Sequence, residues 1–63
     1  MKQWLIIRYN NKDFEEHIYK TFYSEEEAVK WFDEFTLNTM PSHFKEWSYE
    51  LIDCYGEMLN CTL

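Results

Sequence analysis

Glycine and proline are almost absent from this sequence of 63 residues, which contains one of each. A chain with one glycine cannot form the glycine-rich loops that hold phosphates in nucleotide-binding proteins. Its longest apolar run, Trp4–Ile7, is far shorter than the roughly 20 residues of a membrane-spanning helix. The sequence also does not begin with the basic segment and apolar core of a secretion signal. We therefore expect a cytoplasmic protein with no membrane partner.

Basic residues are scarce too, with six Lys and Arg against twelve Asp and Glu, for a net charge of -6. Because cationic side chains supply most of the affinity for nucleic acids, no direct binding of nucleic acid is expected. Residues 24–57 carry nine acidic and two basic side chains, whereas residues 1–23 nearly balance. This asymmetry predicts an acidic surface and a protein partner with a basic surface. The predicted contact residues are Glu26, Asp33, Glu34, Glu46, Glu50 and Asp53.

The acidic side chains also have a simpler explanation. Acids in the first turn of a helix interact favourably with the helix dipole, and exposed charges keep a small protein in solution. That explanation accounts for Glu25–Glu27 but not for the acids that come later in the chain. At the level of sequence, both a binding surface and a merely solubilising one remain open.

No pattern of catalytic or metal-binding residues is present. Cys54 and Cys61 are separated by six residues and the two histidines, His17 and His43, are scattered, which does not match the spacing of zinc sites. A nucleophilic cysteine needs positive surroundings, whereas Cys54 directly follows Asp53. We therefore predict a protein that is not an enzyme and has no metal or cofactor. Its cysteines are expected to be reduced and to act as small hydrophobic residues.

Two segments rich in β-branched and aromatic residues, 2–10 and 14–22, predict a β-hairpin around the turn residues 10–13. A two-residue loop would place Tyr9 opposite Phe14. Alternation then predicts a core face made of Leu5, Ile7, Tyr9, Phe14, Ile18 and Phe22. The opposite face is mixed and would expose an apolar patch of Trp4, Ile6 and Tyr19, with His17 on the same face.

Ser24–Glu27 has the pattern of a capping box and predicts a helix that begins there and ends near Asn38, before Pro41. Its inward side would carry Ala28, Phe32 and Phe35, and its outward side Glu26, Lys30, Asp33 and Glu34. Residues 39–46 are not assigned. Two further strands are predicted at 47–55 and 58–62, around a turn at Gly56.

These elements predict one α+β domain, residues 1–63, with a small antiparallel sheet in β-β-α-β-β order and one helix packed on one face. One helix covers only one face of a sheet. The open face, with Trp4, Ile6, His17 and Tyr19 from the hairpin and with Ile52 and Cys54 from the third strand, is therefore expected to be an interface with a partner or with a second copy. A homodimeric structural module that pairs through this face is the alternative function.

The predicted hairpin from Trp4 to Phe22, the helix start at Ser24–Glu27, the strand from Trp47, the short length and the excess of acid resemble small acidic phage-encoded proteins that act on host machinery. Examples are the phage inhibitor of uracil-DNA glycosylase and the phage antitoxin that neutralises a host ribonuclease toxin. The resemblance lies in organisation, without a shared motif, so no functional residue is carried over. It implies an inhibitor or modulator that binds a basic site on a nucleic-acid enzyme or defence protein, in the cytoplasm of a bacterial host. The acids would then either imitate nucleic-acid phosphates or only solubilise the chain.

Overall fold

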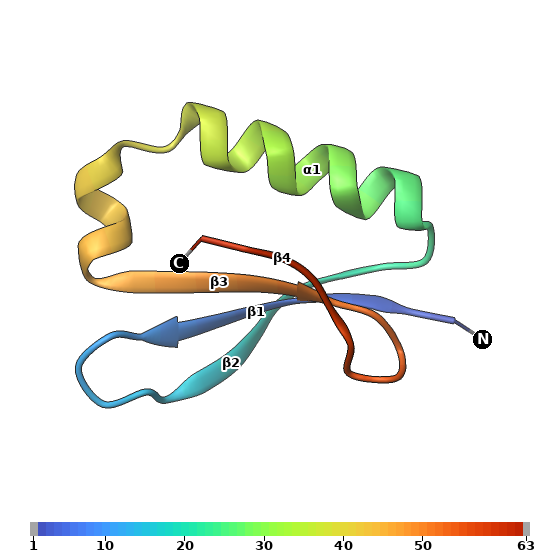
Figure 1. The fold of residues 1–63 in the computed structure, drawn as a ribbon, viewed down its shortest axis with the longest axis horizontal. Coiled ribbons are helices and arrows are strands. Elements are labelled where there is room, and N and C mark those ends of the chain that lie inside the picture. Colours follow the sequence, from blue (N-terminus) through green and yellow to red (C-terminus); the bar gives the residue numbers. More distant parts are fainter. Residues whose placement is uncertain (1, 63) are drawn as a thin grey trace.

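Four strands and one long helix make up this computed structural model, which describes residues 2–62. The strands form one antiparallel sheet in the order β2-β1-β3-β4. The predicted α+β fold in β-β-α-β-β order is confirmed. The elements are β1 (Trp4–Asn10), β2 (Glu16–Phe22), α1 (Glu25–Asn38), a short 3-10 helix η1 (Pro41–Lys45), β3 (Trp47–Ile52) and β4 (Met58–Cys61) (Figure 1).

Helix α1 begins and ends where the sequence predicts. The hydroxyl of Ser24 accepts a hydrogen bond from the backbone N–H of Glu27 at 3.4 Å, which satisfies one of the unpaired donors of the first turn. At the other end, the N–H of Thr39 donates to the carbonyl of Phe35, and Met40 adopts the extended backbone favoured before proline. The unassigned segment 39–46 contains η1.

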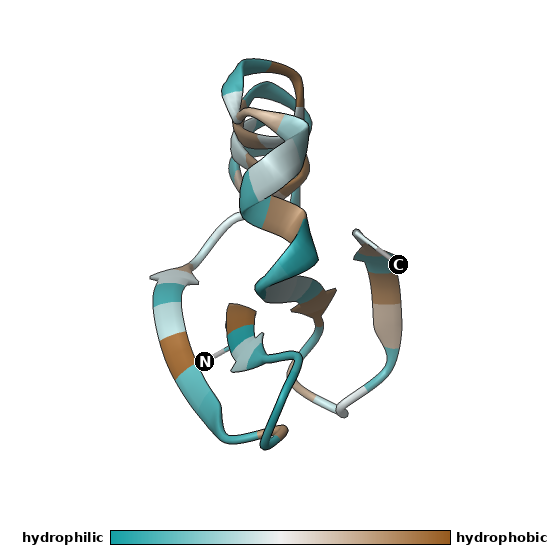
Figure 2. Ribbon diagram, turned by 90° about the vertical axis from the view of Figure 1, so that its left-hand side faces the viewer, coloured by the Kyte–Doolittle hydropathy of each residue, from teal (hydrophilic) through white to brown (hydrophobic). Residues whose placement is uncertain are grey.

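Helix α1 packs on one face of the sheet, which we call the covered face (Figure 2). The inward side of α1 and the outward position of its acids are as predicted. Rings dominate this contact: within α1, Trp31 stacks on Phe35 at 4.9 Å between centroids, and Phe35 meets Tyr49 of β3 edge-on at 4.7 Å. Five core residues have at most 1% of their surface exposed, namely Ile6, Ala28, Phe32, Tyr49 and Leu51.

The predicted assignment of the two sheet faces is wrong. Ile6 is fully buried under α1, and Trp4 packs against the same core. The ring centroid of Tyr19 lies 5.4 Å from that of Tyr49. Alternation separates two sets of residues, but both sets contain large apolar residues, so alternation alone does not decide which set faces the helix. Of the predicted core face, Phe22 does pack on the core, whereas Leu5, Ile7, Tyr9 and Ile18 lie on the other side of the sheet.

A β-bulge in β2 explains why Phe22 changes sides. Ile6 pairs with Lys20 and Ile7 pairs with Ile18, so Tyr19 is an additional residue between them. A bulge sets two residues of one strand against one of the other. Tyr19 and Lys20 consequently both contact the aromatic residues of the covered face. From this point on, the register is shifted by one residue relative to an unbulged hairpin.

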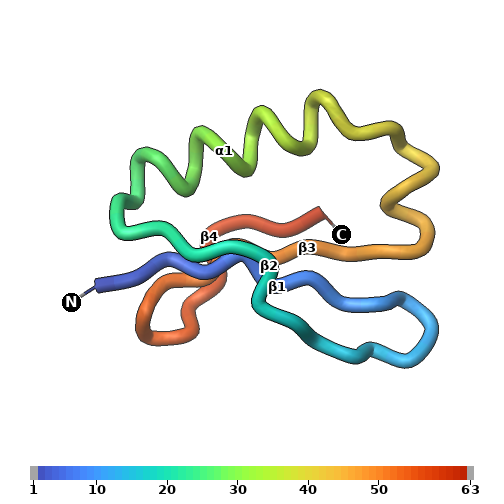
Figure 3. The backbone as a smooth tube through the Cα atoms, turned by 180° about the vertical axis from the view of Figure 1, so that it is seen from behind, coloured from blue at the N-terminus to red at the C-terminus, as the bar shows by residue number. Residues whose placement is uncertain are grey.

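The hairpin loop is longer than predicted, because Tyr9 pairs with Glu16 and not with Phe14. Residues 11–15 form the loop, which lies at the same end of the sheet as η1 (Figure 3). The side-chain amide of Asn11 donates to the carbonyls of Phe44 and Lys45, at 3.2 and 3.0 Å, and ties the loop to the segment before β3. Phe14, predicted in the core, is 69% exposed and has a left-handed backbone with φ 59°.

Candidate interaction surfaces

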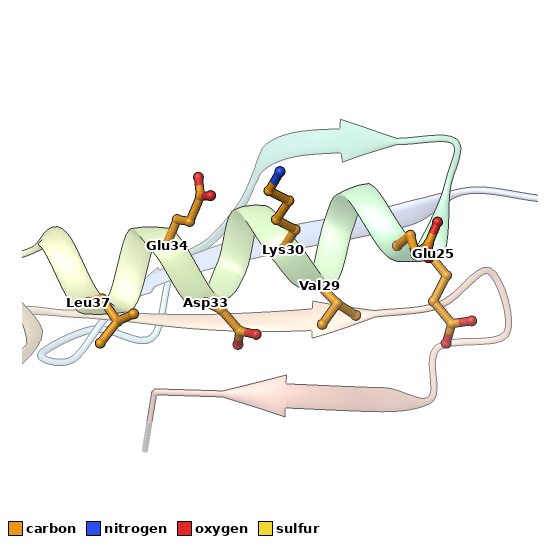
Figure 4. A pocket seen from close by; sticks show the side chains of 7 residues that line it. Glu25, Val29, Lys30, Asp33, Glu34 and Leu37 are labelled. Carbon is orange, nitrogen blue, oxygen red and sulfur yellow. The ribbon is translucent and has the colours of Figure 1, made fainter.

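The solvent side of α1 forms an open hollow along the helix, which we call the acidic helix surface (Figure 4). Its residues form two rows along the helix. Within each row the spacing is four residues, which places the side chains one above the other on successive turns. One row ends in an apolar residue, Leu37, that is 83% exposed. The acidic helix surface consists of Glu25, Glu26, Val29, Lys30, Asp33, Glu34 and Leu37.

Within residues 2–62, no Lys or Arg nitrogen lies within 4.0 Å of the carboxylates of this surface. Lys30 is four residues from both Glu26 and Glu34, yet it forms no ion pair with either. Across residues 2–62, the one pair within 4.0 Å joins His17 Nε2 to Glu15 Oε1, at 3.9 Å, in the hairpin. The negative charge of α1 is therefore available to a partner.

Two cations of the described chain lie on aromatic rings. The guanidinium of Arg8 lies 4.4 Å from the ring centroid of Trp47 and 5.2 Å from that of Tyr19. Its Nε is buried and forms no hydrogen bond within residues 2–62. The ammonium of Lys20 lies 5.3 Å from the ring of Trp31. These cations stabilise the covered face by cation–π contact and leave the acids of α1 unpaired.

The structure separates the six predicted acidic contact residues. Glu26, Asp33 and Glu34 lie together on the acidic helix surface. Glu46 is exposed after η1, and its carbonyl accepts a hydrogen bond from the N–H of Asn11. Asp53 belongs to the turn between β3 and β4, where its Oδ1 accepts from the N–H groups of residues 55 and 57 at 2.9 Å.

Glu50, the remaining predicted acid, lies on the face of the sheet away from α1. It pairs with Ile7 in β1 and Cys61 in β4. Tyr9 Oη donates to Glu50 Oε1 at 3.3 Å. Glu50 and the acids of α1 are thus on opposite sides of the sheet and cannot contact one flat partner surface together.

Apolar side chains from all four strands lie on that side of the sheet, which we call the uncovered face. Ile7 pairs with Ile18, and Ile52 pairs with both Leu5 and Met58. Directly paired residues share a face, so these five residues are neighbours. Ile18 is 64% exposed and Met58 is 54% exposed. In Figure 2 the helix lies on the other side of the sheet.

The prediction of which residues form the open-sheet interface is therefore wrong. Trp4, Ile6 and Tyr19 belong to the covered face, and His17, opposite Arg8 in the hairpin, shares the side of Arg8. Leu5, Ile7 and Ile18 of the uncovered face are predicted in the core instead, whereas Ile52 lies on the open face as the sequence predicts. The hairpin sequence carries no signal for this choice, because the set with Trp4 and Tyr19 has fewer aromatic residues than the set with Tyr9, Phe14 and Phe22.

Two tyrosines have a raised pKa. Burial is the main cause for Tyr9, and the negative charge and hydrogen bond of Glu50 raise its pKa further. Burial also raises the pKa of Tyr49, with a contribution from Tyr19, while the nearby Arg8 guanidinium opposes the shift. The hydroxyl of Tyr49 is hydrogen-bonded to His43 Nε2 at 2.7 Å. Both phenols are in positions that favour the neutral form.

Within the described chain, no three His, Cys, Asp or Glu side chains are placed so that they could hold a metal ion. None of its helices is both long and apolar enough to cross a membrane. The chain matches no protein-family model, no curated protein and no solved structure.

Proposed function

We propose that this protein is a non-enzymatic interaction module whose acidic helix surface binds a basic surface on another protein. The proposal includes an inhibitory or modulating role against a nucleic-acid enzyme or a defence protein of a bacterial host, because such enzymes present basic surfaces to hold nucleic acid. The observation that supports it is the lack of any Lys or Arg ion pair to the acids of α1 within residues 2–62.

Charge and apolar contact have separate roles in this proposal. Unpaired carboxylates on one side of a small protein attract a basic partner over a distance and orient the approach. Glu26 and Glu34 lie eight residues apart, which is about 12 Å along a helix. The exposed side chains of Val29 and Leu37 lie on the same surface and would lose contact with water in the complex. Binding should therefore weaken with salt and with loss of Leu37.

The test begins with a tagged protein and a bacterial lysate. Bound proteins are eluted along a salt gradient and identified by mass spectrometry. Two matched variants decide whether the acidic helix surface is responsible: Glu26→Lys with Glu34→Lys, and Glu15→Lys with Glu16→Lys. Each pair raises the net charge by the same amount, and all four residues are exposed. The second pair lies in the hairpin, so it controls for overall charge.

We expect a specific basic partner to be retained by the wild type and by the hairpin variant, and to be lost from the helix variant at moderate salt. Equal retention by both variants would contradict the proposal, since overall charge would then matter more than position. A partner that stays bound to the helix variant at every salt concentration would do the same.

A further inference from the structure

We draw no further inference here: the strongest candidate, the apolar uncovered face of the sheet with Leu5, Ile7, Ile18, Ile52 and Met58, carries none, because nothing in the structure shows what covers it.

Discussion

The two faces of the sheet are both apolar, but one is lined largely by rings and the other by aliphatic side chains. On the covered face, Trp31 and Phe35 of α1 meet Tyr19 and Tyr49 of the sheet. On the uncovered face, Leu5, Ile7 and Ile52 have no helix above them. The comparison teaches that hydrophobic alternation defines two faces, while the packing of sheet side chains against the aromatic rings of α1 determines which face is buried.

The largest expected effect compares two neighbouring isoleucines on opposite faces. Ile6→Ala should lower the free energy of unfolding by about 2 to 5 kcal/mol, because it leaves a cavity in a closed core. A domain of this length has only about 3 to 9 kcal/mol in total, so this variant should be close to unfolded. Ile7→Ala, at a partly exposed site, should cost about 1 kcal/mol or less.

Urea unfolding followed by tryptophan fluorescence measures both variants. The two substitutions remove the same atoms from adjacent positions of β1, so each is the control for the other. A larger loss of stability for Ile7→Ala would mean that the faces are assigned the wrong way round.

A medium effect is expected in the loop that joins the two strands of the hairpin. Phe14 holds a left-handed backbone, which costs a residue with a Cβ about 1 to 2 kcal/mol. Asn tolerates this conformation better, so Phe14→Asn should raise the melting temperature by several degrees, at about 4 to 8 °C per kcal/mol. Phe14→Ala keeps the Cβ and should change the melting temperature little. Equal melting temperatures for the two variants would contradict a strained Phe14.

The smallest effect concerns pH and again compares the faces. Tyr9 on the uncovered face and Tyr49 on the covered face both have a pKa raised above the ordinary value of 10.0. The unfolded chain therefore loses these protons at a lower pH than the folded chain. The stabilisation is present in full below pH 10 and is lost as the pH rises through the folded-state pKa values.

Unfolding between pH 8 and 11 measures this loss for the wild type, Tyr9→Phe and Glu50→Gln. Tyr9→Phe should make the alkaline loss of stability less steep, because one titrating group is removed. Glu50→Gln should have a weaker effect in the same direction, since it removes the charge and leaves the burial. An unchanged slope in Tyr9→Phe would contradict the shift assigned to Tyr9.

Local patterns in the sequence predicted the elements well. Ser24 fixes the start of α1 through a contact three residues away, and Pro41 limits its end, so short segments are sufficient to place both ends. The order of the elements and the side of α1 that carries Ala28 and Phe32 follow from periodicity alone.

The register and the faces could not be predicted in this way, because they depend on contacts distant in sequence. The five-residue loop is held by bonds from Asn11 to Phe44 and Lys45, more than 30 positions away. The bulge at Tyr19 coincides with ring contacts to Trp31, Phe35 and Tyr49. Of the candidate sites, the acids of α1 were predictable from helical spacing, whereas the uncovered face was not.

The most direct test of this account is a proton NMR measurement of nuclear Overhauser effects between the Phe32 ring and the methyl groups of Ile6 and Ile7. These neighbours in β1 point to opposite sides of the sheet, and Ile6 and Phe32 belong to the same core. The account predicts strong effects from Phe32 to Ile6 and none to Ile7. Strong effects from Phe32 to Ile7, with none to Ile6, would show that the aliphatic face is the buried one and would contradict the fold.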